Sequence, residues 1–357
     1  MKSKVILVVL CAIFCLAFLF SPRINSETYA DTSAQAMVVI EANSNRVLMS
    51  KNENIKRANA STTKIATFLT VLKHCKNFDE IVEIDDRAIG IEGTSIYLRK
   101  GEKLTVKELL YGMMLVSGND AATALALHIS DSVDDFARLM TKEAHACGAL
   151  NSTFKNPHGL DQDGHQTTAY DLAQITRECY KYPIFEEIVT TQNVKIPNGD
   201  NGYRYLKNKN KLLWSLDGCV GVKTGFTNDA GRCLVSSARR NNMHLICVVL
   251  SCGPMFEDSA YMIEQCFSNY SMSNILPPYN YIKSIPVSNS EKTSVKVYTQ
   301  RGFMYPLTKE EEQNIKIEID AQDVLVAPVE KEQIVGEIKI YLDNHLLFSE
   351  KSILWKM

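Results

Sequence analysis

Two pairs of short apolar runs bracket a long stretch with helical spacing, and this order restricts the fold more than any other feature. The runs 37–40 and 46–49 are separated by polar and small residues that include asparagine, which is typical of a β-hairpin. The runs 233–238 and 243–250 repeat the pattern, with an Arg-Arg-Asn-Asn turn between them. Between the two pairs, i, i+3, i+4 spacing predicts helices from residue 62 onward and at 106–116, 121–129, 133–147 and 169–180. The order predicts an α/β domain whose sheet joins strands from both ends around a helical cluster.

The sequence changes character after residue 267. A break containing Pro277 and Pro278 is followed by period-two alternation, a sign of short strands separated by turns. The alternating stretches are 294–298, 315–319, 324–326 and 336–340. We therefore expect a catalytic domain over residues 31–275 and a small all-β C-terminal domain over residues 276–357.

The first thirty residues read as an export signal. Lys2 and Lys4 precede an apolar run over residues 5–20, and small residues surround a predicted cleavage point after Ala30. The run is shorter than the roughly twenty apolar residues that span a bilayer, which favours a cleaved signal peptide over residues 1–30. The last residues, 355–357, show no amphipathic helix pattern. We expect an exported protein in an extracytoplasmic, cell-wall or periplasm-like space, with membrane association only through an uncleaved signal segment.

Composition narrows the classes of partner. Lys and Arg number 39 and Asp and Glu 41, which leaves no basic excess for binding nucleic acid. The ten cysteines form no C-x-x-C pair, and the histidines show no ligand spacing. We expect mostly buried thiols, no metal and no cofactor.

Serine and lysine stand three residues apart in the tetrad Ser-Thr-Thr-Lys at 61–64, at the predicted start of a helix. Positions i and i+3 share a helix face, so the Lys64 amine can reach the Ser61 hydroxyl. A lysine acts as a base at neutral pH only if burial or a second cation lowers its pKa, and Lys223 is a candidate for that cation. The tetrad alone is weak support for a nucleophile and its base.

A Ser-Gly-Asn triplet at 117–119 follows an apolar run and is expected in a loop between two helices. There Ser117 can relay a proton to a leaving amine, and Asn119 can hold Lys64 or a substrate amide. The simpler interpretation is an ordinary interhelical loop in which Asn119 or Asp120 caps the next helix.

A Lys-Thr-Gly triplet at 223–225 is expected on a strand at the edge of the sheet. Lys223 would supply positive potential and Thr224 a hydroxyl for a carboxylate, while Gly225 would let a substrate backbone pair as an added strand. Each motif is weak alone, but the three in this order favour acyl transfer from a peptide-like substrate.

With these three motifs the chain resembles the serine D-alanyl-D-alanine carboxypeptidases, the low-molecular-mass penicillin-binding proteins. The resemblance covers nearly all of the mature chain and extends to residues 156–160, 168–172, 211–214 and 217–218. It implies a β-lactamase/transpeptidase-like α/β domain, an antiparallel sheet with a helical cluster, followed by the β domain. It also implies release of the terminal D-alanine from peptidoglycan stem pentapeptides and covalent inhibition by β-lactam antibiotics.

The resemblance assigns roles residue by residue. Catalytic residues would be Ser61 as the acylated nucleophile, Lys64 as the base, and Ser117. Substrate-binding residues would be Asn119, Lys223, Thr224, Gly225 and Phe226, with the backbone N–H groups of Ser61 and Phe226 forming the oxyanion hole. His158 is interpreted as structural.

Three departures from the family pattern bear on substrate binding. Asn59 stands where the family often has proline, which alters loop stiffness, and residues 253–258 lack an arginine that some relatives carry. Lys209 stands where many relatives have arginine, which keeps the charge but loses the bidentate fork. Affinity for the substrate carboxylate is affected more than the type of reaction.

Three alternatives to carboxypeptidase activity need to be weighed. A D,D-endopeptidase acting on peptidoglycan cross-links would need the same groups. A class A β-lactamase would need a Glu-x-x-Leu-Asn type motif, and none follows Asn119 at a suitable distance. A penicillin-binding sensor without turnover would have no need of Ser61, Lys64 and Lys223 together.

Overall fold

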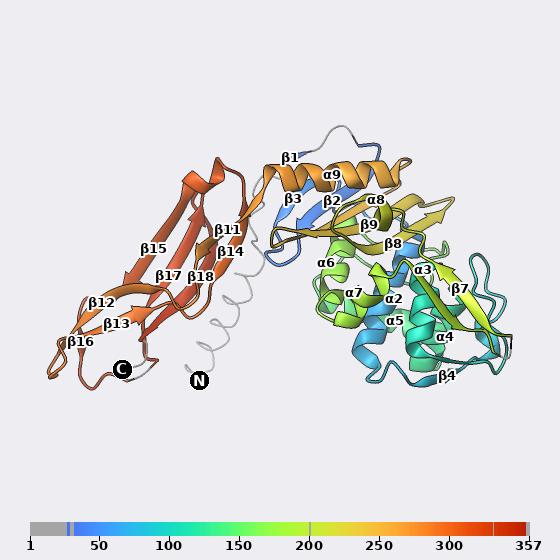
Figure 1. Ribbon diagram of the computed structural model, residues 1–357, viewed down its shortest axis with the longest axis horizontal. Coiled ribbons are helices and arrows are strands. Elements are labelled where there is room, and N and C mark those ends of the chain that lie inside the picture. Colours follow the sequence, from blue (N-terminus) through green and yellow to red (C-terminus); the bar gives the residue numbers. More distant parts are fainter. Residues whose placement is uncertain (1–26, 29–31, 200, 331, 355–357) are drawn as a thin grey trace, which may run out of the picture. The chain divides into compact units, whose positions relative to one another are not determined.

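The computed structural model describes residues 27–28, 32–199, 201–330 and 332–354 (Figure 1). The predicted signal peptide, residues 1–30, lies outside these ranges except for Glu27 and Thr28. The chain divides into two compact units between Met272 and Ser273, whereas the sequence predicted a boundary near residue 275.

The unit Glu27–Met272 contains a six-stranded sheet with the strand order β1-β3-β2-β10-β9-β8. Its strands are β1 (Glu27–Thr28), β2 (Ala36–Glu41), β3 (Val47–Lys51), β8 (Cys219–Thr227), β9 (Gly231–Arg240) and β10 (Met243–Leu250). Neighbouring strands are antiparallel, apart from the parallel pair β1 and β3. Both predicted hairpins are confirmed, and β2 pairs directly with β10, so the sheet joins the two ends of the unit as predicted.

Alternation along the central strands divides the apolar side chains between two cores. On β2, Val38 and Ile40 pack with the helical cluster, whereas Met37 and Val39 face the other side. Residues of β10 divide in the same way, and every residue of β2 and β10 is buried. Both faces of the sheet are therefore covered, which explains the continuous apolar runs.

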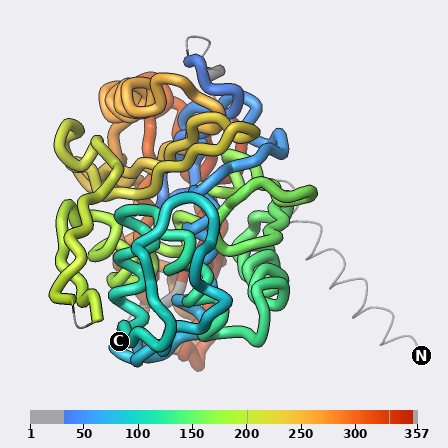
Figure 2. Tube along the Cα trace, turned by 90° about the vertical axis from the view of Figure 1, so that its right-hand side faces the viewer, coloured from blue at the N-terminus to red at the C-terminus, as the bar shows by residue number. Residues whose placement is uncertain are grey.

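Helices cover the two faces of the sheet in the ribbon view of Figure 1, and the Cα trace of Figure 2 agrees with this layering. One face carries α9 (Met255–Asn269), which contributes Met262, Ile263 and Cys266 to the core. The other face carries α2 (Lys64–His74), α3 (Val106–Leu115), α4 (Asn119–Ile129), α5 (Val133–Ala146), α6 (Ala169–Cys179) and α7 (Pro183–Thr190). The predicted helices are confirmed to within a few residues, whereas α7, α9 and the short α8 (Leu212–Ser215) were not predicted.

Side chains at the helix starts explain the boundaries of three helices. Thr105 forms a capping box with Glu108 at the start of α3. Ser132 and Thr168 accept backbone N–H groups in the first turns of α5 and α6. Two small hairpins, β4 (Ile81–Glu83) with β5 (Lys103–Thr105) and β6 (Asn193–Pro197) with β7 (Tyr203–Lys207), were not predicted.

The second unit begins at Ser273 and is built of strands, as the alternation predicted. Six of them form a sheet with the order β15-β17-β18-β13-β12-β16, and β11 pairs with β14 separately. Their bounds are β11 (Ser271–Leu276), β12 (Tyr281–Ser288), β13 (Ser294–Tyr298), β14 (Phe303–Leu307), β15 (Ile315–Ala321), β16 (Leu325–Val326), β17 (Ile334–Leu342) and β18 (His345–Leu354).

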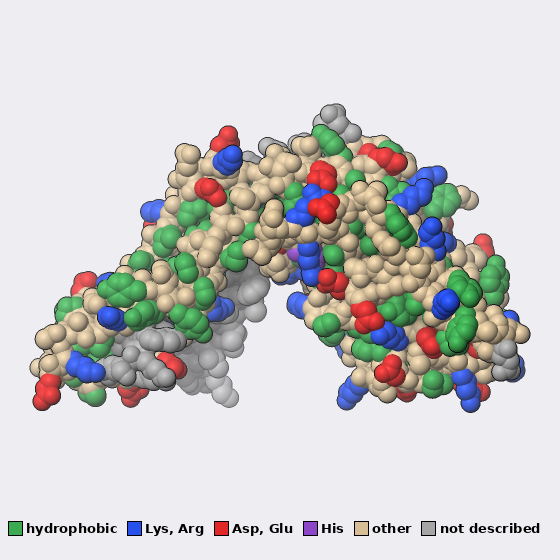
Figure 3. Space-filling model, viewed as in Figure 1, with side chains coloured by type: hydrophobic (Ala, Val, Ile, Leu, Met, Phe, Trp, Pro, Cys, Tyr) green, Lys and Arg blue, Asp and Glu red, His purple; other side chains and the backbone are tan. Residues whose placement is uncertain are grey.

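Charges of both signs are mixed over the surface in Figure 3, in keeping with the net charge of −2. In the ranges that the structure describes, no helix combines the length and apolar character needed to cross a membrane. The eight cysteines from Cys75 to Cys266 are free thiols, and most are buried, as expected from their apolar neighbours.

Phe68 on α2 provides a test of the helical core. Its ring is 0% exposed and meets the Phe185 ring edge-on, with centroids 5.0 Å apart. We expect Phe68→Ala to lower the free energy of unfolding by ~3–5 kcal/mol, because truncation leaves a cavity that neighbouring helices cannot fill. Ile55→Ala removes an apolar side chain that is 50% exposed and should change it by less than about 0.5 kcal/mol. Urea unfolding followed by circular dichroism measures both, and equal losses would contradict this account of the core.

Candidate active site

The first and third motifs meet where the turn before α2 contacts the edge strand β8. Ser61 lies in a 3-10 turn, η1 (Ala60–Thr63), which runs directly into α2. A Cβ on Gly225 would lie 3.0 Å from the Ser61 nitrogen and 3.1 Å from the Asn59 oxygen. The absence of a side chain at Gly225 therefore lets the strand backbone approach the backbone of the serine.

Lys64 is fully buried and its amine joins three elements. Nζ lies 3.0 Å from Ser61 Oγ, 2.7 Å from Asn119 Oδ1 and 2.8 Å from the backbone oxygen of His158. The Asn119 amide is oriented by its other end, because Nδ2 donates to the Glu92 oxygen at 2.6 Å. Two of the three partners of the amine are thus carbonyl oxygens, which can only accept.

The surroundings of Lys64 favour its neutral form. Burial is the largest cause that lowers its pKa well below 10.5, and the positive charges of Lys223 and Lys209 add to this, against an opposing effect of Asp120. A neutral amine has two N–H donors and one lone pair. With both donors directed to the two carbonyl oxygens, the lone pair faces the Ser61 hydroxyl, so the amine can accept its proton.

The loop at residues 156–160 presents the His158 oxygen to this amine. Asn156 folds the loop by accepting the Gly159 N–H at 2.7 Å and donating to the Leu160 oxygen at 3.0 Å. Thr67 on α2 fixes the loop by donating to the Pro157 oxygen at 2.6 Å. Gly159 has φ +87°, and a Cβ there would lie 1.9 Å from the Ala60 oxygen, so this position requires glycine.

Two histidines beside the loop are held neutral. Burial is the main cause that lowers the pKa of His158 to about 3 and that of His165 to about 4. His165 Nδ1 accepts the Lys155 N–H at 3.1 Å, so its Nε2 carries the proton and donates to Thr63 Oγ1 at 2.8 Å. The His158 backbone oxygen, rather than its imidazole, contacts Lys64, in keeping with the structural role expected for the ring.

The Ser-Gly-Asn turn connects α3 to α4 and holds a second loop beside the site. Ser117 is 6% exposed with φ +70°, and Asn119 is already the first residue of α4 rather than a loop residue. The Asn119 N–H donates to the Thr94 oxygen at 2.7 Å, and the Asp120 carboxylate accepts the N–H groups of Ile96 and Leu98. Sequence reasoning considered Asp120 only as a helix cap and missed this tertiary role.

The Lys-Thr-Gly triplet lies on β8, which is the last strand of the sheet, as predicted. Lys223 is almost fully buried, and its amine donates to the Thr224 oxygen at 2.8 Å. Burial, followed by the charge of Lys209, lowers the pKa of Lys223 to about 7. Thr224 is half-buried, and Phe226 is 63% exposed. Successive residues of β8 thus supply a lysine amine, a threonine hydroxyl and backbone groups.

The structure joins Ser61, Lys64 and Asn119 by direct contacts, and Gly225 contacts the Ser61 backbone. Nothing in the sequence indicated the roles of the His158 and Glu92 backbone oxygens, because no local pattern marks a tertiary hydrogen bond to a carbonyl. Asn156 belongs to the stretch 156–160 of the resemblance, but no role was predicted for it. Within the described ranges no group of three or more His, Cys, Asp or Glu side chains is placed to ligate a metal ion.

Comparisons with known proteins agree with this geometry. A family model for D-alanyl-D-alanine carboxypeptidases matches residues 23–253, and a model for the C-terminal domain of penicillin-binding protein 5 matches residues 270–353. The chain is 33% identical to D-alanyl-D-alanine carboxypeptidase DacF of Bacillus subtilis, covering 88% of this chain and 83% of that protein. It is 31% identical to DacA of Escherichia coli K12, covering 90% and 81% respectively.

Solved structures resemble the fold over most of its length. Penicillin-binding protein 5 from Haemophilus influenzae aligns with a TM-score of 0.76 at 28% identity, covering 92% of this chain and 98% of that one. The chain therefore belongs to the D-alanyl-D-alanine carboxypeptidase family, the penicillin-binding serine hydrolases, and is an enzyme of that kind. The α/β fold with an added β domain that the resemblance implied is confirmed.

Gly159 allows a matched test of the loop that presents the His158 oxygen. Gly159→Ala and Gly148→Ala both place a side chain at positive φ, but only Gly159 meets the turn that carries Ser61, since nothing lies within 4 Å of a Cβ at Gly148. Both variants should lose ~1 kcal/mol or more of stability through backbone strain. Only Gly159→Ala should slow acylation by a fluorescent penicillin, by at least about tenfold, because the Ala60 oxygen must move. Equal acylation rates would show that this contact does not position Ser61.

Proposed function

We propose that this carboxypeptidase releases the terminal D-alanine from peptidoglycan stem pentapeptides through an acyl-enzyme on Ser61. The observation that carries the proposal is the contact between the Ser61 hydroxyl and an amine whose other two partners are carbonyl oxygens. An amine in this arrangement is a base for the serine proton.

In the acylation step, Ser61 Oγ attacks the carbonyl carbon of the penultimate D-alanine while the Lys64 amine takes the hydroxyl proton. The N–H groups of Ser61 and Phe226 are assigned to the developing oxyanion, which agrees with the close approach of β8 at Gly225. The bond from the carbonyl carbon to nitrogen then breaks. The departing D-alanine amine receives a proton relayed from Lys64 through Ser117, leaving an ester on Ser61.

The terminal carboxylate is assigned to Lys223 and Thr224. Lys223 is buried and its charge is disfavoured without an anion nearby, so a substrate carboxylate would stabilise the protonated amine. Lys209 adds positive potential from the segment after β7, although it lacks the fork of an arginine. Asn119 is assigned to positioning both Lys64 and the substrate amide.

Water completes the cycle by attacking the ester carbon. Lys64, neutral again, accepts a proton from the water, and the ester bond to Oγ breaks. The tetrapeptide carboxylate leaves, and Ser61 regains its proton. A β-lactam, whose strained amide resembles the scissile bond, would acylate Ser61 by the same first step.

The N-terminal sequence supports export as the setting of this activity. A charged start, an apolar run over residues 5–20 and small residues before Ala30 are typical of a secretory signal peptide. We place the mature enzyme in the extracytoplasmic space, in peptidoglycan metabolism and in the control of cell shape.

Mass spectrometry of residues 31–357 with a muropeptide pentapeptide tests the proposal. The native enzyme should release one D-alanine, and Ser61→Ala should release none, because the ester cannot form. Benzylpenicillin should add its mass to the native protein and not to Ser61→Ala. Penicillin labelling without D-alanine release would contradict the proposal; a cross-linked muropeptide then separates an endopeptidase, which cuts it, from a sensor, which does not.

Two lysines predict a bell-shaped pH dependence of kcat/KM. Activity should rise with pH as Lys64 loses its proton, at a pKa well below 10.5. It should fall above about pH 7 as Lys223 loses the charge assigned to the carboxylate. Lys223→Arg keeps that charge, so its falling limb should move to higher pH, whereas Lys142→Arg on the exposed face of α5 should leave the profile unchanged. A falling limb that stays in place in Lys223→Arg would remove Lys223 from this role.

A further inference from the structure

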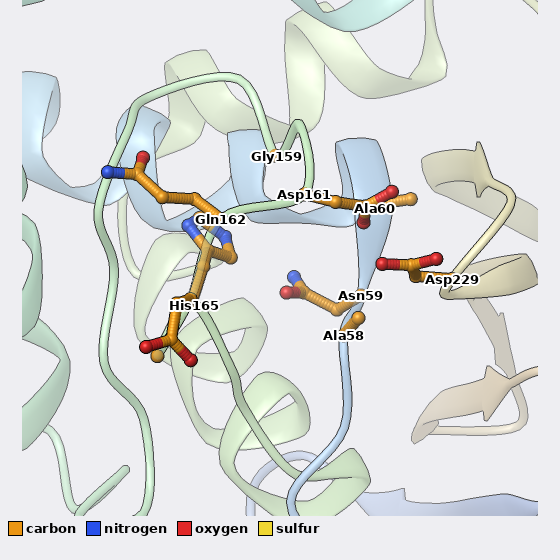
Figure 4. A pocket seen from close by; sticks show the side chains of 10 residues that line it. Ala58, Asn59, Ala60, Gly159, Asp161, Gln162, His165 and Asp229 are labelled. Atoms are coloured by element: carbon orange, nitrogen blue, oxygen red, sulfur yellow. The ribbon is translucent and has the colours of Figure 1, made fainter.

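Two surfaces lie close to the reacting groups. The cavity of about 330 Å³ in Figure 4 adjoins the turn that carries Ser61 and belongs to the active site. The other surface is the β6–β7 hairpin, which has no part in the steps above. The chain leaves β7 and reaches the site at Lys209, whose N–H donates to the Leu115 oxygen at 3.0 Å. Burial lowers the pKa of Lys64, and the charge of Lys209 adds to this effect, so the hairpin leads directly to the base.

Alternation along the hairpin separates a buried face from an exposed one. Ile196 on β6 and Leu206 on β7 are buried and pack in the helical core. The alternate positions of β7 point the opposite way, and there Tyr203 is 61% and Tyr205 73% exposed. In Figure 3, hydrophobic and basic side chains gather over the region that Figure 1 labels β7. Two aromatic rings therefore stand on the outer face of one strand, in contact with solvent.

Lysines accompany the rings on this outer face. The Lys195 amine lies 5.1 Å from the centre of the Tyr205 ring, which is its partner across the two strands. The Lys207 amine lies 5.4 Å from the centre of a ring of Trp214, a residue that is 45% exposed. Neither lysine forms an ion pair with a residue that the structure describes, and the segment 201–215 contains no Asp or Glu. The outer face is therefore both aromatic and positively charged.

A buried arginine fixes the direction in which this face points. Arg204 stands between the two tyrosines in the chain and turns to the opposite side, where its guanidinium donates to the Glu102 carboxylate at 2.6 and 2.8 Å. It also donates to the backbone oxygens of Ile96, Tyr97 and Pro197. A hairpin attached by this many charge-assisted bonds loses little freedom when a ligand binds its outer face. The rings therefore form a preorganised surface.

Rings and ammonium groups close together restrict the chemistry of a partner. A ring stacks on a flat apolar surface, such as the C–H face of a sugar, and an ammonium group attracts carboxylates. The polymer of the proposed function supplies both, because its stem peptides are carried by a chain of sugars and end in the carboxylate of D-alanine. Since the hairpin leads to the active site, a polymer bound there keeps its stem peptides close to the reacting groups.

We propose that the outer face of the hairpin binds a sugar chain of the polymer whose stem peptide is being cut, together with carboxylates of neighbouring stem peptides. This hairpin platform comprises Lys195, Tyr203, Tyr205, Lys207 and Trp214. The inference rests on the proposed function and adds a polymer-binding site to it. A second contact raises the effective concentration of stem peptides at the nucleophile. A free peptide gains nothing from the rings, because it carries no sugar.

Two matched substrates test the platform separately from the reaction. One is a preparation of soluble, uncross-linked glycan strands that bear pentapeptides, and the other is the same pentapeptide without sugar. Release of D-alanine gives kcat/KM per peptide for each substrate. The ratio of the two values is taken within each variant, so a partly inactive preparation does not alter it. The native ratio should exceed one and should fall as salt is added, because exposed ammonium groups are screened.

A double variant, Tyr203→Ala with Tyr205→Ala, should lower the ratio at least about fivefold, because two stacking contacts are lost. Tyr203→Phe with Tyr205→Phe keeps both rings and should keep the native ratio. Tyr281→Ala removes another half-exposed tyrosine from β12, outside the hairpin, and should keep it as well.

The outcomes separate this inference from the proposed function. An equal ratio in the native enzyme and in the variant without the two rings would overturn the platform and leave the carboxypeptidase proposal standing. Ring-dependent binding to anionic phospholipid vesicles, with an unchanged ratio, would also overturn it and assign the rings to a membrane surface. A native ratio that does not respond to salt would overturn the carboxylate contacts of the lysines. Failure to release D-alanine from either substrate would overturn the proposed function, and the inference with it.

Discussion

A fully buried lysine amine, Lys64, held between two carbonyl oxygens, is the arrangement on which the rest of this site depends. Removing an ammonium from water is costly, and no carboxylate pairs with Lys64 among the described residues. Burial instead lowers the pKa of Lys64 well below 10.5, which favours the neutral amine. Three separate segments contribute its neighbours: the 3-10 turn that carries Ser61, the start of α4 and the loop at 156–160. Each segment is fixed in turn by its own hydrogen bonds, through Thr67, Asn156 and Asp120. The packing and hydrogen bonds of the helical cluster therefore hold the partners of the Lys64 amine in place.

Glycine sets the distances around this amine at two places. Gly225 lets β8 approach the Ser61 backbone, and Gly159 lets the loop pass against the Ala60 oxygen. Both contacts are between backbones, so their geometry follows from the sheet and the turn rather than from flexible side chains. The assignment of the oxyanion hole to Ser61 and Phe226 draws on that close approach.

Much of the fold could be predicted from the sequence because its apolar patterns are regular. The hairpins and the helices at 106–116 and 169–180 carry strong periodicity and turn or cap residues, and the edge position of β8 followed from its motif. Helix α9 was missed because its buried stripe is narrow, with exposed aromatic and acidic residues between the core positions. Among site residues, motifs identified the side chains that the structure brings together. The His158 and Glu92 oxygens could not be predicted, since any residue supplies a backbone carbonyl.

Strand order has a consequence for how the catalytic unit is made. The N-terminal hairpin of β2 and β3 has its sheet partner in β10, so the pairing of Val39 with Cys247 closes nearly the whole unit. Without residues 243–250, one edge of β2 has no strand partner, and the helical cluster lacks the β10 side chains that it packs against. Contacts this distant in sequence slow folding, because a long loop must close before they form. The sheet of the catalytic unit therefore needs residues near both ends of the unit, and the edge strand β8 is linked to β2 only through β9 and β10.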